Sequence, residues 1–232
     1  MRNKLILEAV GVFFLCLAAL LGASPLPTAA LLAALVYCAA PVAFPHFNPA
    51  VSLAFRLRGR LGAGALWLYL AVQLAAGAAA LLTACLLQES SPERAKEALD
   101  NLALSPYDGM FASMVSEGLG SFLLVAVVLV VATSRRTAGN SYFGLAIGLA
   151  WLGIVGAFAE LAPLVNPLTS LLTACRGWVE ALFDDTVGAK ALVTESLLLA
   201  KVAPRVAGDI AAQFAGAALA AGLFRSVLPE ER

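Results

Sequence analysis

Charged side chains are scarce in this chain, and their scarcity excludes several classes of protein at once. Only 13% of the 232 residues are Asp, Glu, Lys or Arg, whereas 61% are hydrophobic, and the mean hydropathy is +0.89. A soluble domain of ordinary composition is far more polar than this. The formal net charge is zero and no basic cluster is interleaved with aromatic residues, so we exclude a nucleic-acid partner. The composition predicts a protein that lies in a lipid bilayer.

Cysteine and histidine are also few, which argues against a metal site. The four cysteines, Cys16, Cys38, Cys85 and Cys175, lie in or beside apolar runs without a CxxC pair, and His46 is the only histidine. We interpret the cysteines as small core residues and expect no metal and no cofactor. No nucleophile, base and stabilising group occur together within the apolar segments, so we do not expect an enzyme.

Six apolar segments are each close to the length of about 20 residues that a membrane-spanning helix requires. They cover residues 5–23, 27–44, 64–87, 111–133, 141–159 and 206–228. The first segment contains Glu8 and has no convincing cleavage site before Pro25, so we interpret it as a retained span rather than a signal peptide. Basic residues fall at both termini and in the second and fourth connections, whereas those on the other side of the membrane are diluted by acidic residues. This distribution predicts a multi-pass protein of the cell (inner) membrane with both termini in the cytoplasm.

Two Asn-Pro pairs about half a chain apart each begin an apolar run that is too short to cross a bilayer. Proline is well suited to the first position of a helix, and the preceding Asn can cap that helix while its amide group donates outward. Two such half-helices, predicted over 48–56 and 166–175, would direct their positive ends at a permeating molecule and repel cations. The residues predicted at this midplane are Asn48, Pro49, Ala50, Asn166, Pro167 and Leu168.

An internal repeat supports the same interpretation. Glu8-x-x-Gly11-x-Phe13 in the first span matches Glu117-x-x-Gly120-x-Phe122 in the fourth. Three spans per half place the second half upside down relative to the first, which is an inverted repeat. We therefore divide the chain into residues 1–110 and 111–232, each with three spans and one half-helix.

Two connecting segments are less regular. An insertion at 176–205 follows the second half-helix, and the sequence leaves open whether it forms an outer or interfacial helix or an irregular loop at a protomer interface. The acidic connection 88–108 is expected to be a solvated outer loop that contains a short helix.

These motifs resemble the aquaporin, or major intrinsic protein, family. The resemblance rests on the run His46-Phe47-Asn48-Pro49-Ala50-Val51-Ser52 and on the paired Glu-x-x-Gly-x-Phe motifs, and it extends from Leu5 to Phe224. It implies an all-α membrane protein of six tilted transmembrane helices and two re-entrant half-helices. It also implies four protomers, each with its own pore, and passive conduction without a cofactor or an energy source.

The chain departs from this family at the positions that select the solute. The family's second motif usually reads Asn-Pro-Ala-Arg, whereas here Leu168 and Thr169 follow Asn166-Pro167. By the family's spacing, the other positions of the selectivity collar are Thr28, Ile154 and Pro163, so the collar has neither an arginine nor an aromatic ring. We expect it to be wider and less selective, and proton exclusion to be weaker. Leu168 is expected to act against the wider collar, because its apolar side chain would narrow one side of the midplane or exclude water from it.

Three polar residues are expected to support the re-entrant loops, namely Glu8 and Glu117 within the spans and His46 just before the first Asn-Pro pair. By resemblance, Glu8 and Glu117 accept hydrogen bonds from the loop backbone, which would offset the cost of a carboxylate in the bilayer. His46 is open to two interpretations, a neutral packing residue or a group that gates the pore as it titrates.

The predicted function is a passive channel for water and small uncharged solutes such as glycerol, urea or neutral metalloid hydroxides. The expected partners are these solutes, the lipid bilayer and three further copies in a homotetramer. A water-selective channel, a non-conducting structural protein and a secondary transporter remain as alternatives. The transporter would require Glu8 and Glu117 as coupling groups.

Overall fold

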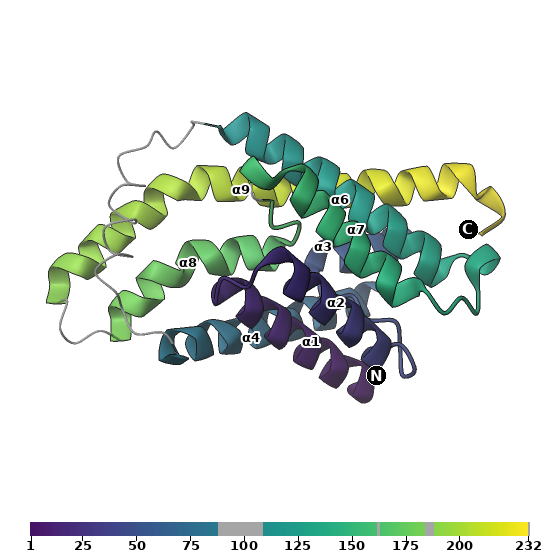
Figure 1. The fold of residues 1–232 in the computed structure, drawn as a ribbon, viewed down its shortest axis with the longest axis horizontal. Coiled ribbons are helices and arrows are strands. Elements are labelled where there is room, and N and C mark those ends of the chain that lie inside the picture. The colour runs from purple at the N-terminus through teal and green to yellow at the C-terminus, as the bar shows by residue number, and fades with distance from the viewer. Residues whose placement is uncertain (88–108, 162, 184–187, 232) are drawn as a thin grey trace.

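The chain forms two successive sets of helices that follow the same order (Figure 1). The structure is a computed structural model, and it describes residues 1–87, 109–161, 163–183 and 188–231. Each set contains two helices, a helix that begins with an Asn-Pro pair, and a further long helix. The first set is α1 (Arg2–Leu20), α2 (Pro25–Ala39), α3 (Pro49–Leu57) and α4 (Ala63–Leu87). The second is α6 (Met110–Thr133), α7 (Phe143–Ala157), α8 (Pro167–Phe183) and α9 (Gly188–Val227), with short 3-10 helices η1 (Arg135–Thr137), η2 (Ala159–Leu161) and η3 (Pro229–Glu231).

Local sequence signals set both ends of the half-helix α3. Asn48 has an extended backbone and its side-chain oxygen accepts a hydrogen bond from the N–H of Ala50 at 2.8 Å, while Pro49 occupies the first helical position. The helix ends at Leu57 and is followed by Gly59, whose φ of 79° is left-handed and therefore favours glycine. Arg60 N–H then donates to the carbonyl of Phe55 at 2.9 Å, as in a Schellman motif. The chain consequently turns back after only nine helical residues.

The long helices pack in pairs, and small residues let them approach closely. α1 packs on α4, α6 on α9 and α2 on α7, while each half-helix contacts the last long helix of the other half. At the α6–α9 contact, Gly216 lies directly against the carbonyl oxygen of Gly118, and a Cβ at 216 would overlap that oxygen. Glycine at helix crossings is common in membranes because it permits close backbone approach.

We therefore expect Gly216→Ala to destabilise the protein by about 1–3 kcal/mol, the usual range for an overpacked core. The obstacle is a backbone atom, so the helices must separate to admit the methyl group. Gly222→Ala on the same helix is the matched control, because no atom lies within 4 Å of its Cβ position. Thermal unfolding of the two variants in detergent measures the difference, and equal transition temperatures would contradict the packing argument.

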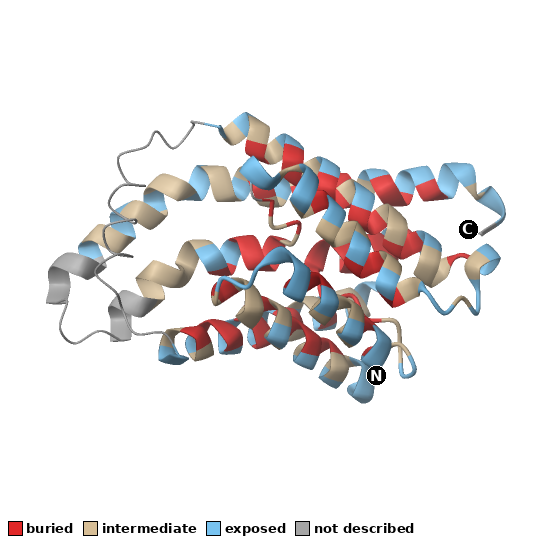
Figure 2. Cartoon of the chain, in the orientation of Figure 1, coloured by how far each residue is buried: buried red, intermediate tan, exposed pale blue. Residues whose placement is uncertain are grey.

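Many residues on the outside of the bundle are exposed (pale blue in Figure 2), and large hydrophobic side chains are among them. Trp67 is 70% exposed and Leu86 is 86% exposed, both on α4, which indicates that these surfaces face lipid. α1, α4, α6 and the part of α9 from Val193 are long and apolar enough to cross a membrane. α2 and α7 have only 15 residues each, shorter than the predicted spans 27–44 and 141–159. α2 ends at Ala39, two residues before Pro41, which has no N–H with which to continue the helical hydrogen bonds.

The second half differs most from expectation after its half-helix. α8 does not end at residue 175 but continues to Phe183, and α9 begins at Gly188. The described part of 176–205 is thus a helical hairpin rather than an irregular loop. α9 has 40 residues, about 60 Å at 1.5 Å per residue, which is about twice the hydrocarbon thickness. The hairpin therefore projects at the end of the molecule opposite both termini (Figure 1), while the predicted acidic loop 88–108 lies outside the described residues.

Candidate functional site

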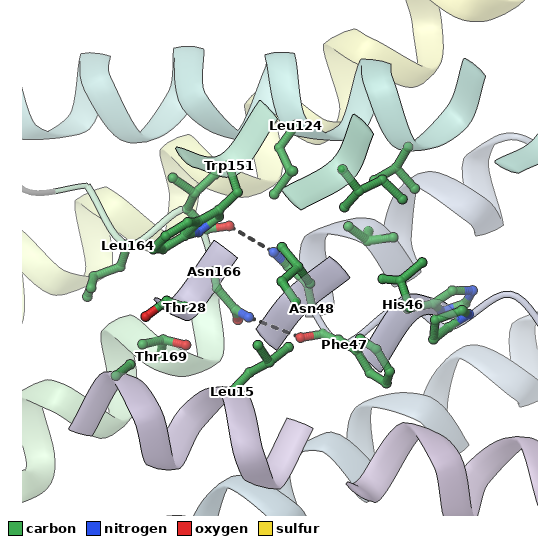
Figure 3. Close-up of a pocket in the computed structure, with 18 residues that line it drawn as sticks. Leu15, Thr28, His46, Phe47, Asn48, Leu124, Trp151, Leu164, Asn166 and Thr169 are labelled. Carbon is green, nitrogen blue, oxygen red and sulfur yellow. Dashed lines mark hydrogen bonds between the residues drawn. The ribbon is translucent and has the colours of Figure 1, made fainter. Parts of the chain in front are cut away.

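The two Asn-Pro helices meet at their N-termini and are joined by reciprocal hydrogen bonds. Asn48 Nδ2 donates to the carbonyl oxygen of Val165 at 2.8 Å, and Asn166 Nδ2 donates to the carbonyl oxygen of Phe47 at 3.1 Å (Figure 3). The side-chain oxygen of Asn166 also caps α8 by accepting from Leu168 N–H at 3.0 Å. Each amide nitrogen carries two hydrogens, so one hydrogen on each Asn remains for another acceptor.

The residue before each Asn has an unusual backbone. Phe47 and Val165 have φ values of 53° and 55°, the only positive values among the described non-glycine residues. A left-handed conformation is costly for a β-branched residue such as Val165 and persists only where the surroundings enforce it. Each of these residues presents its carbonyl oxygen to the opposite Asn, so the conformation is linked to the junction of the two helices.

A buried carboxylate holds the first loop in this conformation. Glu8 accepts hydrogen bonds from the N–H groups of His46 at 2.9 Å and Phe47 at 2.5 Å, and from Gln73 Nε2 at 2.7 Å. Gln73 Nε2 also lies 3.0 Å from Ser52 Oγ on α3. Glu8 is 1% exposed, so these donors supply the hydrogen bonds that water would otherwise provide.

The second loop has the same arrangement. Glu117 accepts from the N–H groups of Leu164 and Val165 and from Gln213 Nε2, each at 2.8 Å. Gln213 Nε2 contacts Ser170 Oγ at 2.9 Å, as Gln73 contacts Ser52. The two networks thus use the same residue types from corresponding helices, Glu, Gln and Ser, to fix the two loop backbones.

The glycine of each repeated Glu-x-x-Gly motif accommodates the loop residue with positive φ. A Cβ at Gly11 would overlap the ring of Phe47, and a Cβ at Gly120 would lie 3.2 Å from Val165 Cγ2. Within one helical turn, the motif therefore provides a carboxylate for the loop backbone and a space for the loop side chain. This role explains why Glu and Gly recur at the same spacing in both halves.

A cavity of about 80 Å³ lies beside the helix junction. Its polar lining residues are Thr28, His46, Asn48, Asn166 and Thr169. The other lining residues are apolar, namely Leu15, Ala19, Leu32, Val36, Pro45, Phe47, Val51, Leu124, Val128, Ile147, Trp151, Leu164 and Val165. No described residue that lines the cavity carries a carboxylate, an ammonium or a guanidinium group, so its polarity comes from neutral side chains, loop carbonyls and helix ends.

The structure brings only two of the four predicted collar residues onto the cavity wall. Thr28 and Thr169 line it, whereas Ile154 is 2% exposed and packs toward Gly120. Pro163 is buried and is likewise absent from the described lining.

Trp151, one helical turn before Ile154, lies on the wall instead (Figure 3). The wall therefore contains an aromatic ring, although the collar read from family spacing had none. The signal in the sequence was the four-residue spacing of Ile147 and Trp151, which places both on one face of α7.

Leu168 also differs from expectation. It is 4% exposed, and its side chain approaches α4, with Cδ2 2.9 Å from the Cβ position of Gly77. It is not among the described lining residues, so in this structure it does not narrow the cavity. Pro49, Ala50 and Pro167 are likewise buried behind the wall, where they form the first turns of the half-helices.

His46 lines this cavity and a second one. The second cavity has a volume of about 430 Å³ and lies at the end of the bundle that carries Met1, Arg60 and Thr133. His46 lines both cavities, stacks on Tyr69 at 4.4 Å between ring centroids and contacts Ser52 Oγ through Nδ1 at 3.0 Å. His46 is the residue common to the described linings of the two cavities, so it lies between them.

Comparison with known proteins gives the same fold and family. The family model described as "Major intrinsic protein" matches residues 10–174. The chain is 35% identical over 156 residues to an aquaglyceroporin of Rhizobium meliloti (strain 1021), covering 66% of this chain and 64% of that protein. It is 31% identical over 115 residues to a putative aquaporin of Arabidopsis thaliana, covering 50% of this chain and 38% of that protein. The chain thus spans less than two thirds of the length of either relative.

A solved structure extends the likeness over almost the whole chain. The X-ray structure of the aquaglyceroporin from Plasmodium falciparum superposes with a TM-score of 0.66 at 14% identity, covering 98% of this chain and 96% of that one. At this identity the likeness concerns the fold alone, an all-helical bundle with two re-entrant half-helices. Together with the family match over most of the chain, it shows that this protein belongs to the major intrinsic protein family.

Proposed function

We propose that the protein is a passive channel for water and small uncharged solutes such as glycerol, urea or neutral metalloid hydroxides. The observation that carries this proposal is the pair of amide groups, Asn48 and Asn166, on the wall of a cavity whose described lining has no carboxylate, ammonium or guanidinium group. Their remaining hydrogens and the adjacent carbonyls can replace part of the hydration shell of a neutral solute. Two helix N-termini directed at the same point disfavour a cation there.

The contacts of Glu8 and Glu117 favour a channel over a secondary transporter. Both carboxylates bind loop N–H groups and a glutamine, and neither lines the first cavity. A coupling group has to exchange its ligand during transport, which these structural bonds oppose. Two features suggested a non-conducting scaffold, the absent arginine and a plug at Leu168, and the second is weakened because Leu168 is not among the described lining residues of the cavity.

A water-selective channel is the second candidate, and Trp151 is the observation that favours it. A large indole on the wall of a cavity of about 80 Å³ reduces the space for a polyol. The relative permeability to water and to glycerol distinguishes the two candidates. We propose in either case that the protein acts as a homotetramer with both termini in the cytoplasm.

Osmotic swelling of proteoliposomes tests the proposal. Vesicles that contain the protein should equilibrate water faster than empty vesicles, without saturation and without a proton or sodium gradient. Ala19→Trp, which places a large side chain on the cavity wall, should abolish the increase. Fluxes identical to those of empty vesicles for water, glycerol and urea would exclude a channel.

Thr169→Arg tests the role of the collar. Thr169 lines the cavity where family members usually carry arginine, so the guanidinium group should narrow the passage and favour water. We expect glycerol flux relative to water flux to fall at least threefold, roughly 0.7 kcal/mol in barrier height. Thr169→Val, which has nearly the same volume, should leave the ratio close to wild type. An unchanged ratio in Thr169→Arg would show that residue 169 does not help select the solute.

A further inference from the structure

The larger cavity has a lining that the conduction of neutral solutes does not require. Two exposed cationic side chains, Lys4 from α1 and Arg60 from the connection before α4, line its rim, and Thr133 adds a hydroxyl group. The described residues that line it include no Asp or Glu. Met1 lines this cavity, and both chain termini lie at this end of the molecule (Figure 1). The positive charge of the rim is therefore concentrated at the end of the bundle that carries the termini.

The start of α4 adds to this positive potential. α4 begins at Ala63, and both Gly62 and Ala65 line the cavity. The first helical hydrogen bond runs from Leu66 N–H to the carbonyl of Gly62 at 3.0 Å, so the N–H groups before it have no partner within the helix. The end of the helix carries roughly half a positive charge, which reinforces that of the side chains.

Nearby carboxylates do not neutralise this charge. Glu8 lies behind His46, and its oxygens accept from two loop N–H groups and Gln73. Glu230, at the same end of the molecule, pairs with Arg136 at 2.7 Å. Lys4 and Arg60 have no ion pair with any carboxylate among the residues that the structure describes.

We propose that this mouth binds an anion carrying a phosphate group, held by Lys4, Arg60 and the first turn of α4. A phosphate dianion matches two cations and a helix N-terminus, the combination that binds phosphate elsewhere in proteins. The cavity, at about 430 Å³, is large enough for the organic part of a phosphate ester or a phospholipid headgroup. Because His46 lines both cavities, the bound anion lies on the route that a solute would take to the first cavity. It therefore lowers the permeability to water and small uncharged solutes. Only this last consequence rests on the proposed channel function.

Calorimetric titration tests the binding independently of conduction. Purified protein in a neutral detergent is titrated with glycerol 3-phosphate and with inorganic phosphate at constant ionic strength. We expect saturable binding of the ester with Kd of about 1 mM or tighter. The double variant Lys4→Gln/Arg60→Gln should bind at least about tenfold more weakly, because it lacks both charge-assisted contacts.

The matched control is Arg2→Gln/Arg56→Gln. It removes the same charge from exposed positions at the same end of the molecule, outside the lining of the cavity. Its affinity should stay within about twofold of wild type, because charges that make no contact are screened. Absence of saturable binding, or equal weakening by both double variants, would overturn the site.

Swelling assays identify the source of the phosphate. Water permeability is measured in phosphatidylcholine vesicles with and without glycerol 3-phosphate on both faces, and in vesicles that contain phosphatidic acid. Inhibition of at least about threefold by the soluble ester alone assigns a soluble ligand, and inhibition by the lipid alone assigns a headgroup; Lys4→Gln/Arg60→Gln should relieve either. Binding without any effect on flux would overturn the position of the anion on the passage. Binding to a protein that never conducts would refute the channel and leave the anion site intact.

Discussion

Glu8→Ala is expected to prevent stable folding of the first re-entrant loop. The substitution leaves the N–H groups of His46 and Phe47 and the side-chain amide of Gln73 without their acceptor in a buried site. At about 1 kcal/mol or more for each orphaned donor, the expected loss is at least about 3 kcal/mol. Thermal unfolding of the purified variant in detergent should show a lower transition temperature or no folded fraction.

Two further variants make this prediction specific. Glu8→Gln retains one carbonyl oxygen as an acceptor, so its loss of stability should be smaller than that of Glu8→Ala. Glu160→Ala removes an exposed carboxylate on η2 and should leave the unfolding temperature unchanged. If Glu8→Ala were as stable as Glu160→Ala, the carboxylate would not be what holds the loop.

Trp151→Ala is expected to convert the channel to one that passes larger solutes. The indole is the largest side chain on the wall of the first cavity, next to Asn166 and Leu164 in Figure 3. Its removal should raise the permeability to glycerol relative to water at least about tenfold, equivalent to a barrier lower by about 1.4 kcal/mol. Solute-by-solute swelling of proteoliposomes measures this ratio.

Trp67→Ala is the matched control for this variant. Trp67 is 70% exposed on the outer face of α4 and does not line the first cavity, so its removal should leave the ratio of glycerol to water unchanged. Increased leakage in both variants would indicate general loosening of the bundle. A ratio that stays at the wild-type value in Trp151→Ala would mean that the passage is narrowest elsewhere.

The lining of the first cavity differs from the collar that family spacing predicts. Counting from Asn166 by family spacing selected Ile154, yet the side chain that lines the cavity comes from Trp151, one turn away on α7. A helix can present either residue after a rotation, and packing decides the rotation. Here Ile154 packs beside Gly120, where the absence of a side chain leaves room for it.

The sequence by itself determined the elements that obey local rules. Asn-Pro pairs start helices, and apolar runs of about 20 residues cross bilayers. The repeated Glu-x-x-Gly motif indicates two halves of similar structure. These features depend on residues within a few positions of one another, so they are readable along the chain. They predicted the all-α membrane fold, the family and the two half-helices.

Only the tertiary structure decided which side chains line the passage and where the inserted segment goes. The continuation of α8 to Phe183, the displacement of Leu168 toward Gly77 and the basic mouth at Lys4 and Arg60 all depend on contacts between distant segments. A helical sequence fixes the relative angles of its side chains but not the rotation of the helix in the bundle. That rotation is set by close packing between helices, which no local pattern encodes.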